Sequence, residues 1–498
     1  MPSPTYPSLY QLNTRVYLTA RSRELGRAAT LDDVPDAELE RLATLGFDWV
    51  WLLSVWRTGE ASRAVSLADP DLRREFAATL PDLRDEDIGG SGFAITGYEA
   101  APALGGDAAL ARLRARMAGH GLRLMLDFVP NHMALDHPWV ADHPERFVAG
   151  TEADLLREPR NWTSLPTSGG RNAVLAHGRD PYFPGWTDTV QLDYGSPDTV
   201  EAMTAELASI AARCDGVRCD MAMLLLPDVF ERTWGHAAEP FWPAAIARAR
   251  AVNPGFLLMA EVYWDLEWTM LGQGFDDAYD KRLYDRLVAG AARPVREHLL
   301  AGLDYQAHLA RFLENHDEPR AAATFPADHH RAAALVTFLT PGLRFFHQGQ
   351  VEGFRKRISP HLVRGPDEPV DAGLERFYGA LLALLRDPLV RDGDWRLLDL
   401  APAWEGNATA DGLVAFAWRL GDRRLVVAVN LSPVQAQAYV CRPLDDLRDA
   451  EVRLGDRLDG MVYERDADEL ADRGLYVDLP PWGHHVLEAT ARRPSAPA

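Results

Sequence analysis

Residues 124–132 read Leu-Met-Leu-Asp-Phe-Val-Pro-Asn-His, an apolar run that ends in polar side chains. A short apolar run bounded by turn residues is typical of a strand that is buried on both faces of a parallel sheet. We predict this strand over residues 123–129. Runs of the same character recur along the chain at residues 12–18, 48–53, 216–220, 256–262, 278–280, 308–314 and 343–347.

Amphipathic stretches typical of helices lie between these runs, for instance at residues 36–45, 108–120 and 199–214. Eight buried strands that alternate with helices predict an α/β protein of the (β/α)8 TIM-barrel type. A doubly wound open sheet fits the same periodicity, so periodicity alone leaves both architectures open.

Two regions depart from the alternation. Residues 133–186 are rich in Pro, Gly, Asn and Asp and show no helix or strand period, which predicts a long functional loop. After residue 388 the pattern changes to alternating segments separated by turn residues, at 412–418, 424–430, 437–441, 451–454 and 484–487. We therefore predict a barrel formed by residues 1–132 and 187–388, an insertion at 133–186 and a C-terminal β-sandwich domain at 389–498.

The composition limits the classes of partner. The chain has 498 residues, of which 73 are acidic and 52 basic, giving a net charge of −21 that disfavours nucleic acid and anionic membranes as partners. Its three cysteines are too few for a disulfide framework and indicate a reducing compartment. With no apolar stretch of about 18 residues and no charged start, the sequence predicts a soluble, cytoplasmic protein. It leaves the oligomeric state open.

Polar side chains lie within the last residues of four of the predicted strands or directly after them. Because a parallel barrel carries its chemistry at the carboxyl ends of its strands, these side chains are the candidates for function. They are Asp127, Asn131 and His132 in residues 124–132, Arg218 and Asp220 in the run at 216–220, Glu261 in the run at 256–262, and His316 and Asp317 after the run at 308–314.

Several carboxylates, a guanidinium and imidazoles on one mouth suit the cleavage of glycosidic bonds. That reaction needs one ionised carboxylate as nucleophile or base and one protonated carboxyl group as acid. Arg218 and Asp220 share a face of their strand, so the guanidinium would keep that carboxylate ionised. Glu261 ends a buried run, and burial beside other carboxylates would raise its pKa and suit it to the acid role.

Taken in order, the four segments resemble the signature regions of the α-amylase superfamily, glycoside hydrolase family 13. Residues 46–53 and 91–106 and the segment Gln191-Leu192-Asp193 are similar to further regions of that family. The resemblance implies a (β/α)8 barrel, with residues 133–186 as the excursion that the family calls domain B.

The resemblance also implies roles for individual residues. Asp220 would be the nucleophile, Glu261 the general acid and base, and Asp317 the third carboxylate, which grips the 2- and 3-hydroxyls of the sugar. The residues implied to bind or brace the substrate are Arg218, His132, His316, Asp127, Phe93 as an aromatic platform, and Tyr98.

Departures from familiar members leave the specificity open. Endo-amylases often carry Lys-His shortly after the nucleophile, whereas Asp220 is followed by Met221, Ala222, Met223 and Leu224. Ala94 stands where many exo-glucosidases carry Asp. Residues 91–95 and 137–147 look more like the maltosyltransferase branch.

The sequence thus predicts a retaining α-glycoside hydrolase that acts on small α-glucosides or short α-glucans. The alternatives are a glucosyl or maltosyl transferase or phosphorylase of the same superfamily, and an inactive sugar-binding protein. No cofactor is expected to be required. A structural calcium ion beside Asn131 stays an alternative.

Overall fold

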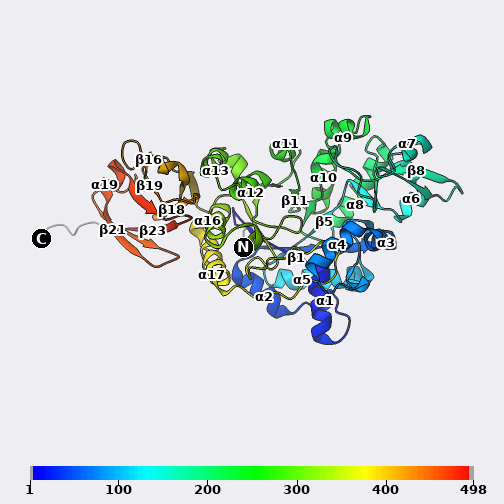
Figure 1. Ribbon diagram of the computed structural model, residues 1–498, viewed down its shortest axis with the longest axis horizontal. Coiled ribbons are helices and arrows are strands. Elements are labelled where there is room, and N and C mark those ends of the chain that lie inside the picture. Colours follow the sequence, from blue (N-terminus) through cyan, green and yellow to red (C-terminus); the bar gives the residue numbers. More distant parts are fainter. Residues whose placement is uncertain (1–3, 493–498) are drawn as a thin grey trace.

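The computed structural model describes residues 4–492, and its centre is a closed barrel of eight parallel strands (Figure 1). The hydrogen-bonded order is β1-β14-β13-β12-β11-β10-β5-β2, so each strand pairs with the barrel strands that precede and follow it in the chain. The strands are β1 (Ser8–Asn13), β2 (Trp49–Leu53), β5 (Arg123–Phe128), β10 (Gly216–Cys219), β11 (Leu257–Ala260), β12 (Asp277–Tyr279), β13 (Leu309–Arg311) and β14 (Leu343–His347). This closed order confirms the predicted barrel and excludes the open sheet.

Helices surround the barrel and connect its strands. The three helices predicted from the sequence are found as α2 (Asp36–Leu45), α5 (Gly106–Gly119) and α8 (Pro197–Ala211). The other connecting helices are α1 (Thr14–Leu25), α3 (Glu60–Ala68), α4 (Pro70–Thr79), α9 (Pro227–Trp234), α10 (Trp242–Val252), α11 (Glu267–Gly272), α12 (Lys281–Val288), α13 (Ala292–Leu299), α14 (Leu303–Gln306), α15 (Ala321–Thr324), α16 (Ala327–Phe338), α17 (Ala372–Leu385) and α18 (Pro388–Arg391).

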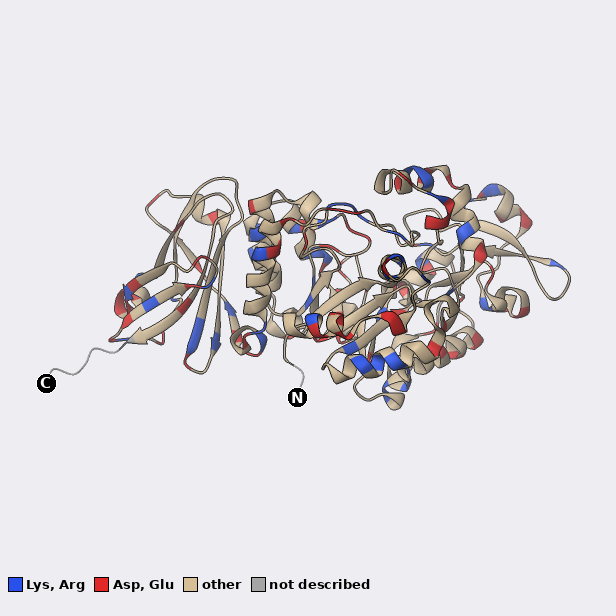
Figure 2. Ribbon diagram, turned by 90° about the horizontal axis from the view of Figure 1, so that it is seen from below, with Lys and Arg blue, Asp and Glu red and all other residues tan. Residues whose placement is uncertain are grey.

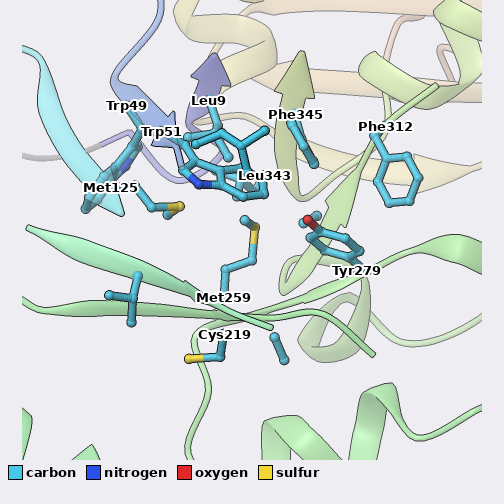
Figure 3. Packing of buried hydrophobic residues seen from close by; sticks show 14 of the residues in the cluster. Leu9, Trp49, Trp51, Met125, Cys219, Met259, Tyr279, Phe312, Leu343 and Phe345 are labelled. Atoms are coloured by element: carbon cyan, nitrogen blue, oxygen red, sulfur yellow. The ribbon is translucent and has the colours of Figure 1, made fainter. Parts of the chain in front are cut away.

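Large apolar side chains from successive strands fill the barrel (Figure 3). Trp49 and Trp51 of β2 lie two positions apart, and both are fully buried with Met259 and Phe345 of other strands. The residue between them, Val50, faces the opposite side and is buried as well, because helices cover the outside of the sheet. Cys219 lies across its strand from the cluster around Met259, where it is a buried apolar side chain.

The strand predicted at residues 12–18 is wrong in its position. Strand β1 covers Ser8–Asn13, and helix α1 begins at Thr14. The Asn13 side chain accepts a hydrogen bond from the Val16 backbone N–H, which caps the helix. That capping interaction ends the strand where the apolar pattern continues.

The insertion between β5 and α8 is more regular than predicted. It contains β6 (His132–Ala134), α6 (Pro138–Asp142), α7 (Glu152–Arg157), β7 (Trp162–Pro166), β8 (Asn172–Ala176) and β9 (Thr189–Gln191). Strands β7 and β8 form an antiparallel hairpin, and β6 pairs with β9. The prediction of a loop without helix or strand is corrected here, because elements of three to six residues are too short to show a period.

The C-terminal part consists of antiparallel sheets, which confirms the all-β prediction. A six-stranded sheet has the order β15-β17-β18-β23-β20-β21, and a three-stranded sheet has the order β16-β19-β22. The strands are β15 (Asp394–Leu397), β16 (Leu400–Pro402), β17 (Leu413–Leu420), β18 (Arg423–Asn430), β19 (Ala436–Val440), β20 (Glu451–Asp456), β21 (Val462–Asp466), β22 (Leu475–Leu479) and β23 (His484–Arg492), with helix α19 (Ala467–Asp472). The exact domain boundaries stay a prediction, and their ends at residues 1–3 and 493–498 lie outside the described residues.

The C-terminal sheets pack against the barrel through one face of β17. The Trp418 indole N–H donates to the Leu339 carbonyl at 2.8 Å, and its ring meets that of Tyr6 edge to face at 5.4 Å. At the opposite end of the molecule lies the insertion, with β8 and α7 (Figure 1). Acidic and basic residues are both scattered over the surface elements (Figure 2). None of the helices between residues 4 and 492 is long and apolar enough to cross a membrane.

Candidate active site

A cavity of about 320 Å³ opens at the carboxyl ends of the barrel strands. This is the end of a parallel barrel at which active sites are built, and the volume lies at the lower end of the range for small-molecule sites. Three of the predicted carboxylates face it. The residues that line it are Ser91, Phe93, His132, Trp186, Asp188, Thr189, Asp220, Met221, Glu261, Tyr263, Asp317, Pro360 and His361.

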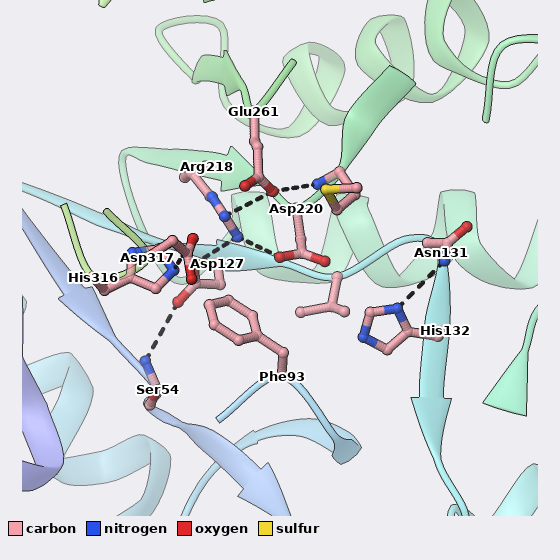
Figure 4. Close-up of polar contacts among 12 residues, drawn as sticks. Ser54, Phe93, Asp127, Asn131, His132, Arg218, Asp220, Glu261, His316 and Asp317 are labelled. Atoms are coloured by element: carbon pink, nitrogen blue, oxygen red, sulfur yellow. Dashed lines mark hydrogen bonds and ion pairs between the residues drawn. The ribbon is translucent and has the colours of Figure 1, made fainter. Parts of the chain in front are cut away.

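The Arg218 guanidinium joins the two central carboxylates (Figure 4). Its Nη1 donates to Asp220 Oδ1 at 2.6 Å, and its Nη2 lies 2.7 Å from Glu261 Oε2. The arginine side chain is only 1% exposed, so this charge is almost fully withdrawn from water. Because Arg218 and Asp220 alternate with Cys219 along the strand, both point to the same side. One buried cation thus fixes both carboxylates at the floor of the cavity.

A tight turn after β10 brings the backbone of Met221 to Glu261. Met221 has φ 42°, in the left-handed region that side chains other than glycine rarely adopt. Its N–H donates to Glu261 Oε2 at 2.6 Å. Strain of this kind concentrates at functional sites, and here it directs a donor to one oxygen of Glu261.

Burial raises the pKa of Glu261 to about 7, and the negative charges of Asp220 and Asp317 act in the same direction. The Arg218 cation opposes the shift without cancelling it. A carboxyl group with a pKa near neutrality can give a proton and take it back within one catalytic cycle. The environment of Glu261 therefore suits the predicted role of acid and base.

Asp127 braces the arginine from β5. Its Oδ1 lies 3.8 Å from Arg218 Nη1, and its Oδ2 accepts a hydrogen bond of 3.4 Å from the Ser54 backbone N–H. Burial raises the pKa of Asp127 to about 7. Asp127 does not line the cavity, so its place behind Arg218 favours a positioning role over sugar contact.

His316 and Asp317 come from the connection after β13. His316 Nε2 lies 3.1 Å from Asp317 Oδ2, while its Nδ1 is hydrogen-bonded to Gln11 Nε2 at 2.8 Å. Burial lowers the pKa of His316 to about 4, so the ring is neutral at physiological pH. Asp317 is partly exposed and faces the cavity, with His316 beside it.

The side chains of Phe93, Trp186 and His132 form the walls of the cavity around Asp220. Phe93 stacks on His316 with ring centroids 5.3 Å apart, and the Arg218 guanidinium lies 5.1 Å from the Phe93 ring centre. His132 packs against Trp186 at 5.2 Å. Phe93, His132 and Trp186 all line the cavity, so the structure brings Phe93 and His132 to the predicted site.

The structure does not bring Tyr98 to this site. Its hydroxyl donates to the Val129 carbonyl at 2.9 Å and accepts from the Val129 N–H at 3.1 Å. The ring is buried against Trp56 and Phe128. The prediction of Tyr98 as a substrate-binding residue is corrected on this ground, because its polar atom is already used within the core.

Several residues that line the cavity were not predicted from the sequence, among them Tyr263, Asp188 and His361. The Tyr263 hydroxyl donates to Glu261 Oε1 at 2.9 Å, and its position two residues after Glu261 is the signal that would have placed it on the same face. Asp188 stands directly before β9, close to the Gln191-Leu192-Asp193 segment. His361 lies in the irregular connection from β14 to α17, where no sequence pattern points to it.

The surroundings of Asn131 do not fit a calcium ion. Asn131 Oδ1 accepts a hydrogen bond of 3.0 Å from Gln191 Nε2, which also donates to the Leu192 carbonyl at 3.1 Å. Calcium requires six to eight oxygen ligands, and here an amide N–H₂ group faces the oxygen that would have to bind it. Across residues 4–492, no group of three or more His, Cys, Asp or Glu side chains is placed to hold a metal.

We expect Arg218→Met to lower the free energy of unfolding by about 3–5 kcal/mol at pH 8, because it leaves buried carboxylates without their cation. The loss should shrink at pH 5, since uncompensated burial raises the carboxyl pKa values and their protonation at lower pH removes the charge. Urea unfolding at both pH values measures this. Arg112→Met, which breaks an exposed ion pair with Asp32, is the control and should leave the free energy of unfolding nearly unchanged at both pH values. An equal loss at both pH values would show that Arg218 contributes packing alone.

Comparison with known proteins agrees with this architecture. Residues 33–243 match the family model described as the catalytic domain of alpha amylase. The α-amylase MalA of Haloarcula japonica is 24% identical over 430 residues, covering 85% of this chain and 55% of that protein. An α-1,4-glucan:maltose-1-phosphate maltosyltransferase of Burkholderia pseudomallei is 25% identical over 311 residues, covering 59% of this chain and 23% of that protein. The chain thus spans about half the length of the first relative and about a quarter of the second.

A solved structure shares the fold over nearly the whole chain. The maltogenic α-amylase AmyB from Thermotoga neapolitana superimposes with a TM-score of 0.70 at 17% identity, covering 97% of this chain and 98% of the other. A closed parallel barrel with carboxylates at the carboxyl ends of its strands defines the class of (β/α)8-barrel proteins with an enzyme-type site. Within that class, the chain is similar to α-amylase catalytic domains, whose family model its residues 33–243 match.

Proposed function

We propose that the protein is a retaining α-glycoside hydrolase that cleaves small α-glucosides or short α-glucans. The observation that carries the proposal is the pair of carboxylates, Asp220 and Glu261, bound to neighbouring nitrogens of the Arg218 guanidinium. Carboxyl groups held side by side in this way favour the closer of the two spacings used by glycosidases, which is that of retaining enzymes.

The proposed reaction has two steps with the same two groups. In the first, Asp220 forms a bond to the anomeric carbon while the bond to the leaving oxygen breaks, and Glu261 gives its proton to that oxygen. In the second, Glu261 takes a proton from water, the water oxygen bonds to the anomeric carbon, and the bond to Asp220 breaks. Two inversions leave the α configuration unchanged.

The other residues would bind the sugar at which the reaction occurs. Asp317 would accept hydrogen bonds from two neighbouring hydroxyls, since its carboxylate faces the cavity beside a neutral His316. Phe93 would offer an apolar face to the ring, and His132 would contact the sugar from the opposite wall. The cavity then binds a distorted sugar from several sides at once.

One observation supports transfer to a sugar acceptor as a second candidate. Tyr182 of the insertion and Trp264, three residues after Glu261, meet edge to face with ring centroids 5.0 Å apart. Both are exposed, Tyr182 to 60% and Trp264 to 36%. Exposed aromatic rings next to the acid residue could stack on a sugar at the leaving-group side, where an acceptor would also bind.

Product analysis tests both candidates. The protein is incubated with maltose, trehalose, sucrose, isomaltose, maltodextrin and maltose 1-phosphate, with and without phosphate or an added acceptor sugar. Hydrolysis predicts free sugar whose first-formed anomer is α by proton NMR. Larger oligosaccharides as the main products would show transfer instead of hydrolysis, and sugar phosphates would show phosphorolysis. A first-formed β-anomer would refute retention of configuration. Asp220→Asn serves as the inactive control.

A further inference from the structure

A second polar cluster lies in the cavity, apart from the catalytic carboxylates. It consists of Asp188, which precedes β9, His361 from the connection between β14 and α17, and Ser62 and Ser66 of helix α3. Asp188 and His361 both line the cavity. Three separate excursions of the chain therefore meet at this wall, and the proposed reaction uses none of these residues.

The barrel order places this wall across the mouth from the acid residue. Strand β1 has β14 and β2 as its neighbours, and β11, which Glu261 directly follows, is fourth from β1 in either direction around the ring. His361 follows β14, and helix α3 follows β2. Glu261 would protonate the leaving oxygen, so the leaving group lies on its side. The wall of Asp188 and His361 is then at the opposite, glycone end.

Asp188 is held with one oxygen unused. The Ser62 hydroxyl donates to Asp188 Oδ2 at 2.6 Å, and that hydroxyl itself accepts from the Ser91 N–H at 2.9 Å. Among the described residues, Oδ1 has no hydrogen-bond partner. The residue is only 8% exposed and lines the cavity, so a nearly buried carboxylate offers an acceptor there.

The hydrogen bonds of His361 determine its tautomer. The Ser66 hydroxyl has a single proton and donates it to the Ser62 carbonyl at 2.9 Å, so at 2.8 Å it accepts from His361 Nδ1. Burial lowers the pKa of His361, and although Asp188 opposes this shift the ring is neutral at physiological pH. Nε2 therefore carries a lone pair and is a second acceptor. It too has no hydrogen-bond partner among the described residues.

We propose that Asp188 and His361 recognise the non-reducing end of an α-glucoside by accepting hydrogen bonds from its free hydroxyls. This inference rests on the proposed glycosidase function. It predicts an exo-acting enzyme, which cleaves at the non-reducing end of its substrate. A terminal sugar has O–H groups that can donate to both acceptors. An internal sugar of a glucan has an ether oxygen at the linkage, which cannot donate and would leave the buried carboxylate unpaired. A site built to bind a hydroxyl discriminates strongly against a ligand that lacks it.

The test compares matched substrates. p-Nitrophenyl α-glucoside and p-nitrophenyl α-maltoside are each used with the 4- and 6-hydroxyls of the non-reducing end free or closed in an ethylidene acetal. For one of the two substrate pairs, we expect the wild-type kcat/KM on the free form to be at least about 100-fold higher than that on the blocked form. The acetal of the blocked form leaves a buried charged acceptor unpaired.

Two variants separate recognition from general damage. Asp188→Asn should lower kcat/KM on the free substrate by about 10- to 100-fold and raise it on the blocked one, because the amide can donate to the acetal oxygen. His361→Phe should lower kcat/KM on the free substrate and leave kcat/KM on the blocked substrate unchanged. Asp142→Asn, an exposed aspartate of α6, is the control and should leave both values and the melting temperature unchanged.

The outcomes distinguish this inference from the function on which it rests. Cleavage of free and blocked forms within threefold of each other by the wild type would overturn the recognition of the chain end but leave the glycosidase intact. Equal losses on both forms in Asp188→Asn would also overturn it, since a structural role would lower both. Failure of the wild type to cleave any of the four substrates or any sugar of the product panel would refute the proposed function and this inference with it.

Discussion

Asp220→Asn is expected to lower kcat on p-nitrophenyl α-glucoside on the order of 10⁴-fold, the usual cost of removing a catalytic nucleophile. The amide has nearly the same shape, but it cannot form the bond to the anomeric carbon. Its carbonyl oxygen can still accept from Arg218, which donates to Asp220 at 2.6 Å in the native protein. Steady-state kinetics of p-nitrophenol release measure the loss, and thermal melting shows whether the fold is retained.

Azide rescue tests the nucleophile role separately from the loss. In Asp220→Gly, azide has room to attack the anomeric carbon from the side that the carboxylate occupied, so the product expected is β-glucosyl azide. Asp215→Asn, at the amino end of the same strand, is the control and should keep kcat within about threefold, because catalytic groups lie at the other end. An active Asp220→Asn enzyme, or α-glucosyl azide from Asp220→Gly, would contradict the assignment.

Glu261→Gln should lower kcat/KM on maltose by about 10²- to 10⁴-fold, the usual contribution of a general acid. The leaving sugar is a poor leaving group and needs a proton. p-Nitrophenolate needs little protonation, so kcat/KM on p-nitrophenyl α-glucoside should fall far less. A comparison of the two substrates measures the proton donation alone, and equal losses on both would argue against Glu261 as the acid.

The pH dependence gives a second readout of Glu261. Since burial raises its pKa to about 7 and the acid must be protonated to act, wild-type kcat/KM on maltose should fall as the pH rises through about 7. Glutamine does not titrate in this range, so the Glu261→Gln variant should lose this alkaline limb. An unchanged alkaline limb in the variant would assign the limb to another group.

The alternation of strands and helices and the carboxylates at the strand ends could be predicted from the sequence because each depends on local patterns. Apolar runs of four to seven residues show buried strands, and a polar residue after such a run is carried to the mouth when parallel strands close into a barrel. Arg218 and Asp220, two positions apart, share a face whatever the rest of the chain does. Asp220, Glu261 and Asp317 therefore reach one cavity as expected.

Tyr98 shows the limit of a local match. It lies in a segment that resembles the family, yet its hydroxyl is bonded to Val129 in the core. The side to which a residue points after a short strand and a turn depends on the elements packed around it. The start of α1 at Thr14 shows the same limit. A single capping side chain, that of Asn13, ends strand β1 within an apolar stretch.

The sequence by itself determined the alternation of strands and helices, the all-β C-terminal part and the order of the polar segments at the strand ends, since periodicity and strand ends are properties of neighbouring residues. Only the tertiary structure decided which residues form the wall facing Glu261. Asp188, His361 and Ser62 lie in excursions after three different strands, and long irregular connections carry no period from which their meeting could be read. Asp188 reaches the cavity from a different part of the chain than Phe93, because closure of the barrel brings distant loops to one mouth.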